Sequence, residues 1–377
     1  MSDPPRHQVM RGPPLVCAAV RVLVAGWVNS PHVVAWADAV TAAGHEVHVA
    51  GRIVPDSPPP AAKGNIHVLP DNGVPLVRSL AMARSLAAVA TGLRPDLVHA
   101  HWLPESGWMA AREELRPLIC SAWGSDVLGV HGIGKRRSRL ALEAANLVFA
   151  DSAELARAAR ELGGGRVPVE VVRWGLDLRR FSPRDRATAR VALGLAPDGP
   201  LVVSPRGVKN VYNPALVLEA FARVRARRPD VRLLFKSPSG HVPDEVAGTI
   251  ERLGLADAVT ILGTIDFDRL PDVYAAADVV VSIPSSDSSP RTVWEALACG
   301  CPVVVSDLPW ARDELVDGRH ALFTPLDPAS VADAIERAFD DDALGKQGRV
   351  LAEATLDPNA CTARIDALYQ SVVDASP

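Results

Sequence analysis

Residues 278–307 (DVVVSIPSSDSSPRTVWEALACGCPVVVSD) constrain the fold of this chain more than any other stretch. Two apolar runs, Val279–Ile283 and Val303–Ser306, flank a short helical stretch that begins near Arg291 and ends at Gly300. Two strands joined by a helix over so short a distance form a crossover connection, which places them parallel in one sheet. The stretch therefore predicts an α/β fold built on a parallel sheet.

The polar loop between the first of these strands and the helix is a candidate ligand site. It lies at the carboxyl end of the strand, where open α/β sheets bind ligands, and the helix points its free N–H groups and positive dipole end into it. Arg291 is unfavourable at that end unless an anion joins it, and Glu295 shares its helix face. Taken alone, this pair is an ordinary surface ion pair. Beside a helix N-terminus it suits a nucleotide diphosphate, with the carboxylate accepting from ribose hydroxyls.

The same loop and helix carry a family resemblance. Asp287, seven further residues, Glu295 and then ALACGCPVVVS resemble the E-x7-E signature of the family 4 retaining glycosyltransferases. In that family the second acidic residue holds the donor ribose, and the first lies near the donor sugar. Asp287 replaces a Glu and is one methylene shorter. The resemblance covers residues 20–373 and implies the GT-B fold, in which two Rossmann-like doubly wound domains face each other across a cleft.

The length of the chain agrees with two domains, because 377 residues exceed one ordinary core. We expect a disordered tail at 1–14, an N-terminal acceptor-binding domain at 15–178 and a C-terminal donor-binding domain at 179–358. A last helix, within 359–377, is expected to pack back on the first domain, as the resemblance implies.

Composition narrows the class of protein. A hydrophobic content of 48% with 22% charged residues is typical of a soluble globular protein. A net charge of −4 does not indicate a basic surface for nucleic acid. We expect no transmembrane segment and a cytoplasmic location, with peripheral association with a membrane left open. Five scattered cysteines, including the isolated Cys299-x-Cys301, support neither a zinc site nor a disulfide framework.

Strand-like and helical stretches alternate through residues 21–172 and predict a doubly wound sheet. One helical stretch, Ser152–Leu162, begins with Ser152 as its predicted N-cap. No G-x-G-x-x-G follows the first strand, which disfavours a dinucleotide site there. Residues 171–183 (VVRWGLDLRRFSP) resemble the interdomain linker of the same glycosyltransferases.

Three loops of this first half resemble the acceptor-side loops of the family: SPH at 30–32, PDLVHAHW at 95–102 and WGSD at 123–126. Their acceptor-side candidates are His32, His101, Trp123 and Asp126. The polar residues of these loops also have plain readings: His32 as a helix-start residue, His99 as an inward strand residue, and Asp126 as a turn or cap residue. Many relatives carry a His where this chain has Trp123. An indole cannot transfer protons, so His101 and Asp126 become catalytic candidates beside Arg206 and Asp287.

In the second half, Arg206 ends the strand Leu201–Ser204 and matches the phosphate-binding Arg of the family. Val211 stands where a partner Lys is usual, so Lys209 or Lys236 is a candidate for that charge, or each is a solvated loop residue. The resemblance and the helix geometry together imply one set of donor-binding residues: Arg206, Lys209, Lys236, Gly263, Asp287, Arg291, Thr292, Val293 and Glu295.

We expect no metal and no other cofactor. Asp266-Phe-Asp268 has the D-x-D pattern of metal-dependent glycosyltransferases of another fold, but it precedes a helical run and is interpreted as a helix N-cap. The acidic run Asp340–Asp342 is interpreted as a solvated helix junction. Cationic side chains and a helix terminus would neutralise the leaving diphosphate.

The resemblance implies a hexosyltransferase that moves a sugar from a nucleotide-diphosphate sugar to an acceptor hydroxyl with retention of configuration. The acceptor class stays open between a glycan, a lipid-linked molecule and a small natural product. Alternatives are a nucleotide-sugar 2-epimerase of the same fold and a non-catalytic nucleotide-sugar-binding protein. An NAD-dependent dehydrogenase is disfavoured by the missing glycine pattern.

Overall fold

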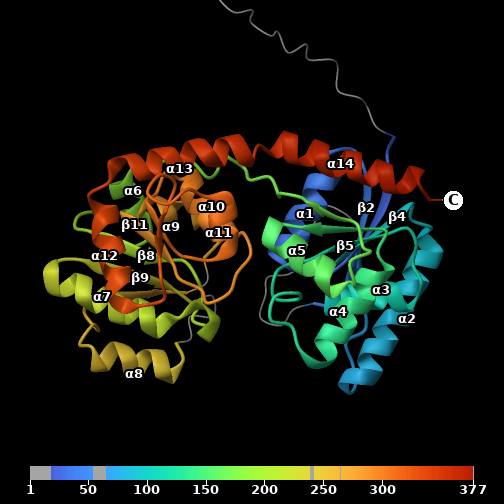
Figure 1. Cartoon of the computed structure of the whole chain (residues 1–377), viewed down its shortest axis with the longest axis horizontal. Helices are drawn as coiled ribbons and strands as arrows, with labels where there is room; N and C mark the ends of the chain where they lie inside the picture. The colour runs from blue at the N-terminus through green and yellow to red at the C-terminus, as the bar shows by residue number, and fades with distance from the viewer. Residues whose placement is uncertain (1–17, 54–64, 238–241, 264, 377) are drawn as a thin grey trace, which may run out of the picture.

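The computed structural model describes residues 18–53, 65–237, 242–263 and 265–376. Its described strands form two sheets, in the orders β3-β2-β1-β4-β5-β6-β7 and β10-β9-β8-β11-β12-β13. Neighbouring strands pair in parallel in both sheets. Helices cover the sheets, and Figure 1 shows the two resulting lobes side by side. The predicted α/β architecture with two doubly wound parallel sheets is confirmed.

The first lobe contains the strands and helices between residues 21 and 171. Its strands are β1 (Arg21–Ala25), β2 (Glu46–Gly51), β3 (Asn65–Val68), β4 (Leu97–His101), β5 (Leu118–Ser121), β6 (Leu147–Ala150) and β7 (Val169–Val171). Its helices are α1 (Pro31–Ala42), α2 (Pro75–Leu93), the π-helix η1 (Trp102–Gly107), α3 (Trp108–Arg112), α4 (Gly132–Ala144) and α5 (Ala153–Leu162).

The strands of this sheet are apolar on both faces because each face is covered by helices. Along β1, Leu23 and Ala25 join one buried cluster, whereas Val22 and Val24 join the cluster on the opposite face. This alternation follows from the two-residue repeat of a strand.

The second lobe repeats the plan. Its strands are β8 (Leu201–Ser204), β9 (Arg232–Lys236), β10 (Val259–Leu262), β11 (Val279–Ser282), β12 (Val303–Ser306) and β13 (Leu322–Thr324). Its helical elements are α6 (Arg186–Ala192), η2 (Asn210–Tyr212), α7 (Pro214–Arg227), α8 (Asp244–Arg252), η3 (Phe267–Arg269), α9 (Leu270–Ala275), α10 (Arg291–Ala298), α11 (Pro309–Glu314) and α12 (Pro328–Phe339).

The strand–helix–strand unit predicted from residues 278–307 is present as β11, α10 and β12. Val280 of β11 pairs with Val303 of β12 in parallel. The helix ends at Ala298 because Gly300 adopts a φ of 75°, with its N–H bonded to Leu297 and the next N–H bonded to Ala296. This pair of bonds is the Schellman motif, which favours glycine at that position.

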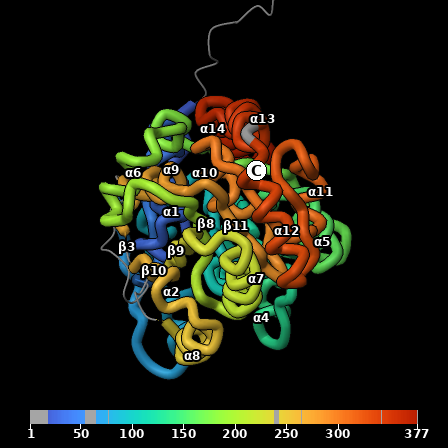
Figure 2. Tube along the Cα trace, turned by 90° about the vertical axis from the view of Figure 1, so that its left-hand side faces the viewer, coloured from blue at the N-terminus to red at the C-terminus, as the bar shows by residue number. Residues whose placement is uncertain are grey.

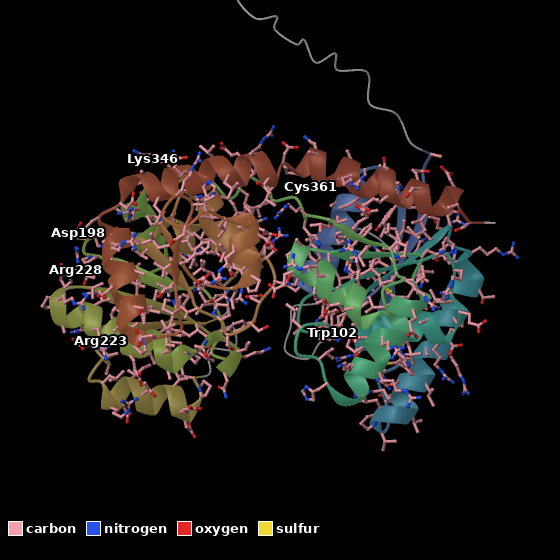
Figure 3. All side chains as sticks on the ribbon, in the orientation of Figure 1. Trp102, Asp198, Arg223, Arg228, Lys346 and Cys361 are labelled. Carbon is pink, nitrogen blue, oxygen red and sulfur yellow. The ribbon has the colours of Figure 1, made fainter. Side chains whose placement is uncertain are left out.

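Two C-terminal helices, α13 (Asp342–Thr355) and α14 (Pro358–Asp374), run along one edge of both lobes (Figure 1). The view in Figure 2 is turned by 90° and places both helices at the same edge, and Figure 3 labels Lys346 and Cys361 along it. Helix α14 lies on the first lobe. The Tyr369 hydroxyl accepts from Trp36 Nε1 at 2.9 Å and lies 2.6 Å from Nδ1 of the buried His99.

The structure corrects one capping prediction. Asp266 stands at the N-cap position of η3, but its side chain makes no capping bond there. The Asp268 carboxylate accepts from Arg180, whose guanidinium also lies over the neighbouring Phe267 ring. In the acidic run, Asp341 does cap α13, since its carboxylate accepts from the N–H groups of the first turn.

Candidate active site

A cavity of about 360 Å³ lies between the lobes. The first lobe contributes the start of α1 and the loops that follow β5 and β6, and the second contributes the loops that follow β8 and β11. A third part comes from the connecting segment, residues 172–185. Both loop sets lie at the carboxyl ends of parallel strands, where this architecture places ligands. The residues of the cavity used below are His32, Trp123, Asp151, Arg173, Trp174, Arg206, Tyr212, Asp287, Ser288, Ser289, Arg291, Thr292 and Trp294.

Arg206 is held at the cavity by three neighbours. Its guanidinium donates to Asp287 Oδ2 at 2.7 Å and to Thr292 Oγ1 at 2.9 Å. The same group lies over the Tyr212 ring, 4.2 Å from the ring centroid. The cation is therefore positioned before any ligand binds, and only 11% of its side chain is exposed.

Asp287 is the partner of that arginine. Its carboxylate accepts from Arg206 and from the backbone N–H of Ser288, the latter at 2.9 Å. Burial raises the pKa of Asp287, and the charge of Arg206 opposes that shift. An ionised Asp287 thus neutralises much of the charge that Arg206 presents to the cavity.

Arg291 and Glu295 are paired, as their helical spacing predicted. Arg291 begins α10, lines the cavity and donates from Nε to Glu295 Oε1 at 3.2 Å. The other oxygen of Glu295 accepts from the Tyr274 hydroxyl at 2.6 Å. Burial raises the pKa of Glu295, while Arg291, Tyr274 and Lys236 act against the shift. Glu295 is 4% exposed and lies behind Arg291, outside the cavity lining.

Four other predicted donor-side residues do not line the cavity. Lys209 is exposed ahead of η2, and Gly263 follows β10. Val293 is fully buried in the core. Lys236 is half-buried at the end of β9, where desolvation lowers its pKa and the nearby Glu295 charge opposes the change.

His32 and Trp123, two of the acceptor-side candidates, line the cavity from the first lobe. Their rings meet edge to face with centroids 5.3 Å apart. Desolvation lowers the pKa of His32 to about 4, and the positive charges of Arg291 and Arg206 act in the same direction. The neutral form of the His32 ring is therefore favoured.

The structure does not bring His101 to the cavity, so its predicted catalytic role loses its geometric basis. His101 follows His99 by two residues on β4, and the strand repeat directs both side chains into the same buried layer. Its ring is fully buried, 5.3 Å from Trp36 and 5.8 Å from Trp123. Burial lowers the pKa of His101 to about 3.

Asp126 requires the same correction. Its side chain is fully buried, and its carboxylate accepts from the backbone N–H groups of Trp123 at 2.8 Å and Leu103 at 3.1 Å. Burial raises the pKa of Asp126 to about 6. Asp126 therefore shapes the loop that carries Trp123, and this matches its alternative interpretation as a turn residue.

Sequence reasoning missed the contact that joins the two lobes beside the cavity. The Ser288 hydroxyl donates to the carboxyl group of Asp151, which follows β6, and lies 2.9 Å from Ser152 Oγ. Burial raises the pKa of Asp151 well above its ordinary value, and the charges of Glu314 and Asp287 act in the same direction. The only local signal was the Ser152 N-cap, which the structure confirms.

A second missed network fixes the loop before α10. Trp294 Nε1 donates to Ser289 Oγ at 2.9 Å, and Ser289 Oγ donates to Glu314 Oε2 at 2.6 Å. Arg173 of the connecting segment lies 3.1 Å from the same Glu314 oxygen. Ser289 has a φ of 40°, which is uncommon for a residue with a side chain and is typical of functional loops. No short-range pattern indicates this network, because its members are far apart in the chain.

Within the described ranges, His, Cys, Asp and Glu form no group of three or more that could hold a metal ion. In the same ranges, no helix combines the length and the apolar character that crossing a membrane requires.

The fold and the position of the cavity define a class of protein. Anabaena HepE, solved with UDP-glucose, has a TM-score of 0.80 and 20% identity, covering 93% of this chain and 100% of that one. Sucrose-phosphate synthase of Thermosynechococcus elongatus has a TM-score of 0.80 and 20% identity, covering 94% of this chain and 99% of that one. These likenesses show the GT-B fold, as the sequence predicted.

Sequence comparison points to the same class of protein. The family model described as glycosyl transferases group 1 matches residues 185–355, and the one described as glycosyl transferase 4-like matches residues 21–152. Residues 185–355 are thus similar to glycosyl transferases group 1, and residues 21–152 to the glycosyl transferase 4-like domain, so both lobes resemble glycosyltransferases. It is 31% identical over 275 residues to D-inositol 3-phosphate glycosyltransferase 2 of Catenulispora acidiphila, and 32% identical over 281 residues to the D-inositol 3-phosphate glycosyltransferase of Nocardia farcinica. These matches cover 65% and 69% of this chain, and 62% of each relative's own length.

Proposed function

We propose that this protein binds a nucleotide-diphosphate sugar in the interlobe cavity and transfers the sugar to an acceptor hydroxyl with retention of configuration. The observation that carries the proposal is the convergence of Arg206, Arg291 and the N-terminus of α10 on one cavity. Two guanidinium groups and free helix N–H groups form a binding site for a diphosphate. The similarity of both lobes to glycosyltransferases supports the same activity.

Glu295 would hold the donor ribose. Tyr274 fixes one carboxylate oxygen, whereas the other accepts only the longer bond from Arg291 at 3.2 Å. A ribose hydroxyl that donates to this second oxygen would replace Arg291. The freed guanidinium, at the first position of α10, would then turn to the diphosphate. Ribose binding and phosphate binding are thereby coupled.

The leaving diphosphate gains negative charge as its bond to the sugar breaks. Arg206 would stabilise that charge without reorganising, because Thr292 and Tyr212 already hold it in place. The acceptor hydroxyl attacks the sugar carbon from the face that the diphosphate leaves. The new carbon–oxygen bond forms, and the hydroxyl proton passes to an oxygen of the leaving diphosphate. Since cationic side chains and helix N–H groups supply the positive charge, we expect no requirement for a divalent metal.

A panel of nucleotide sugars tests the proposal. Thermal shift identifies the donor that binds, and incubation of that donor with candidate acceptors should release nucleotide diphosphate together with a new glycoside. Conversion of the donor into its 2-epimer, without an acceptor, would instead indicate an epimerase. Tight binding with no turnover under any acceptor would indicate a binding protein.

A further inference from the structure

Three rings form one side of the cavity, and we call them the aromatic wall: His32, Trp123 and Trp174. The His32 centroid lies 5.3 Å from Trp123 and 5.6 Å from Trp174, and the two indoles are 6.0 Å apart. All three pairs meet edge to face. The rings come from α1, from the loop after β5 and from the connecting segment, so packing alone brings them together.

The aromatic wall is backed by buried rings. Trp36 is 3% exposed and meets Trp174 edge to face at 5.3 Å, and the fully buried His101 lies 5.8 Å from Trp123. Side chains packed on such a layer have few alternative positions. The wall therefore presents a fixed, largely apolar surface to whatever occupies this side of the cavity.

Charge is distributed unevenly around the cavity. Among the described residues that line it, the cations are Arg173, Arg206 and Arg291, and none belongs to the first lobe. Each already has a carboxylate within 3.2 Å: Glu314, Asp287 and Glu295 respectively. Within the part of the chain that the structure describes, the ionisable groups that line the cavity from the first lobe are His32, whose neutral form is favoured, and the carboxyl group of Asp151.

Arg52 is a cation at the same edge of the first lobe's sheet, but its guanidinium is paired with other carboxylates. Arg52 follows β2 and donates from Nε to Glu105 Oε1 at 3.1 Å, with Asp71 at 3.9 Å. It does not line the cavity. A phosphate on this side would lose its hydration and meet indole rings and a carboxyl group, which is costly for an anion without a cationic partner.

We propose that the acceptor is an uncharged hydroxylated ring, a sugar or a cyclic polyol, that lays its apolar C–H face on the aromatic wall. This inference rests on the proposed function. Such a ring combines an apolar face with hydroxyls, and binding sites for small molecules pair apolar walls with a few placed polar groups in the same way. Asp151, which lines the same cavity, is the polar group that one acceptor hydroxyl would meet. The proposed acceptor thus has no phosphate group, unlike the inositol phosphate that the names of the D-inositol 3-phosphate glycosyltransferases contain.

Paired acceptors test the proposal. Initial rates are measured at saturating donor with myo-inositol and with methyl glycosides, and with the phosphate monoester of each. We expect kcat/KM for a neutral ring to exceed that for its phosphate ester at least tenfold. Comparing inositol with the glycosides separates a polyol acceptor from the sugar end of a glycan. A phosphate ester preferred over its neutral parent, or no glycosylation of any neutral ring while donor hydrolysis proceeds, would overturn the proposal.

Two variants at one position test the wall itself. Trp123→Ala should raise the acceptor KM at least tenfold, whereas Trp123→Phe, which keeps a ring, should stay within about threefold. Binding of the nucleotide diphosphate alone, measured by calorimetry, shows that both variants are folded. An unchanged acceptor KM in folded Trp123→Ala would contradict the wall.

Donor binding and acceptor-free donor hydrolysis separate this inference from the proposed function, because neither needs an acceptor. A chain that binds no nucleotide sugar would overturn the proposed function, and this inference with it. A chain that hydrolyses its donor but prefers phosphorylated acceptors would overturn this inference alone.

Discussion

The hydroxyl of Ser288, on the loop after β11, donates a hydrogen bond to the carboxyl group of Asp151, at the end of β6. The two residues lie in different lobes and are 137 positions apart in the chain. Close packing surrounds the contact, since a Cβ on Gly124 would lie 3.3 Å from the Ser288 side chain. The loop that carries Asp287 is therefore anchored to the first lobe, and the protonation of Asp151 is linked to that anchoring.

Asp151 should make the stability of the protein depend on pH. Burial raises its pKa well above the ordinary value of 3.8, so the folded state binds a proton that the unfolded state has released. Its contribution to stability is full below that ordinary value and falls as pH rises toward the folded pKa. Asp151→Asn removes the titration. We expect the melting temperature of this variant, relative to the wild type, to be higher at about pH 8 than at about pH 4.

Melting curves of both proteins across that range check this prediction, because other buried carboxyl groups contribute equally to both. A difference between variant and wild type that stays constant with pH would show that Asp151 titrates normally.

Arg206→Ala should lower kcat by roughly 10²–10³-fold, the usual effect of removing one preorganised group that stabilises the leaving charge. Arg206 contacts the cavity directly, whereas Lys209 is exposed and does not line it. Lys209→Ala is therefore the matched control and should keep a kcat close to that of the wild type. The comparison uses initial rates at saturating donor, with folding checked by circular dichroism. The reverse order of effects would assign the phosphate-binding role to the lysine.

Glu295→Ala should weaken nucleotide diphosphate binding by roughly 1.5–3 kcal/mol, the range for hydrogen bonds to a charged group. Tyr274→Phe removes only the hydroxyl that orients the carboxylate, so it should cost less, about 0.5–1.5 kcal/mol. Calorimetric titration of the nucleotide diphosphate into each variant measures both effects. Equal affinity in folded Glu295→Ala and wild type would remove the ribose assignment.

Transfer should persist in excess EDTA, because Arg206, Arg291 and the N–H groups of α10 supply positive charge where the diphosphate leaves. Nucleotide release is measured before and after chelation, and again after adding Mg²⁺ or Mn²⁺. Activity that is lost to EDTA and restored by either ion would contradict this account of the leaving group.

Local sequence patterns were sufficient for the framework. The β11–α10–β12 unit, the Ser152 cap and the strands of both sheets except β13 follow from periodicity and capping, which act over a few neighbouring residues. The same unit carries much of the site. Asp287, Arg291 and Thr292 lie at the strand end and helix start where such sheets bind ligands, and Arg206 takes the equivalent position after β8.

Local sequence pattern did not predict which polar residues at the strand ends are buried. His101 and Asp126 have residue types and positions suited to catalysis, yet both are fully buried. Whether a polar residue at a strand end faces the cavity or the core depends on what packs over it. Here α1 and α14 cover the layer that holds His99 and His101.

The sequence by itself determined two parallel sheets, the loops at their carboxyl ends and a cationic donor side, because strand periodicity and helix termini are local properties. Only the tertiary structure decided how the lobes meet. It joined Asp151 to Ser288, tied Arg173 to Glu314 and assembled the aromatic wall from three distant segments. These contacts depend on how segments far apart in the chain pack together, and no short-range pattern in the chain encodes that packing.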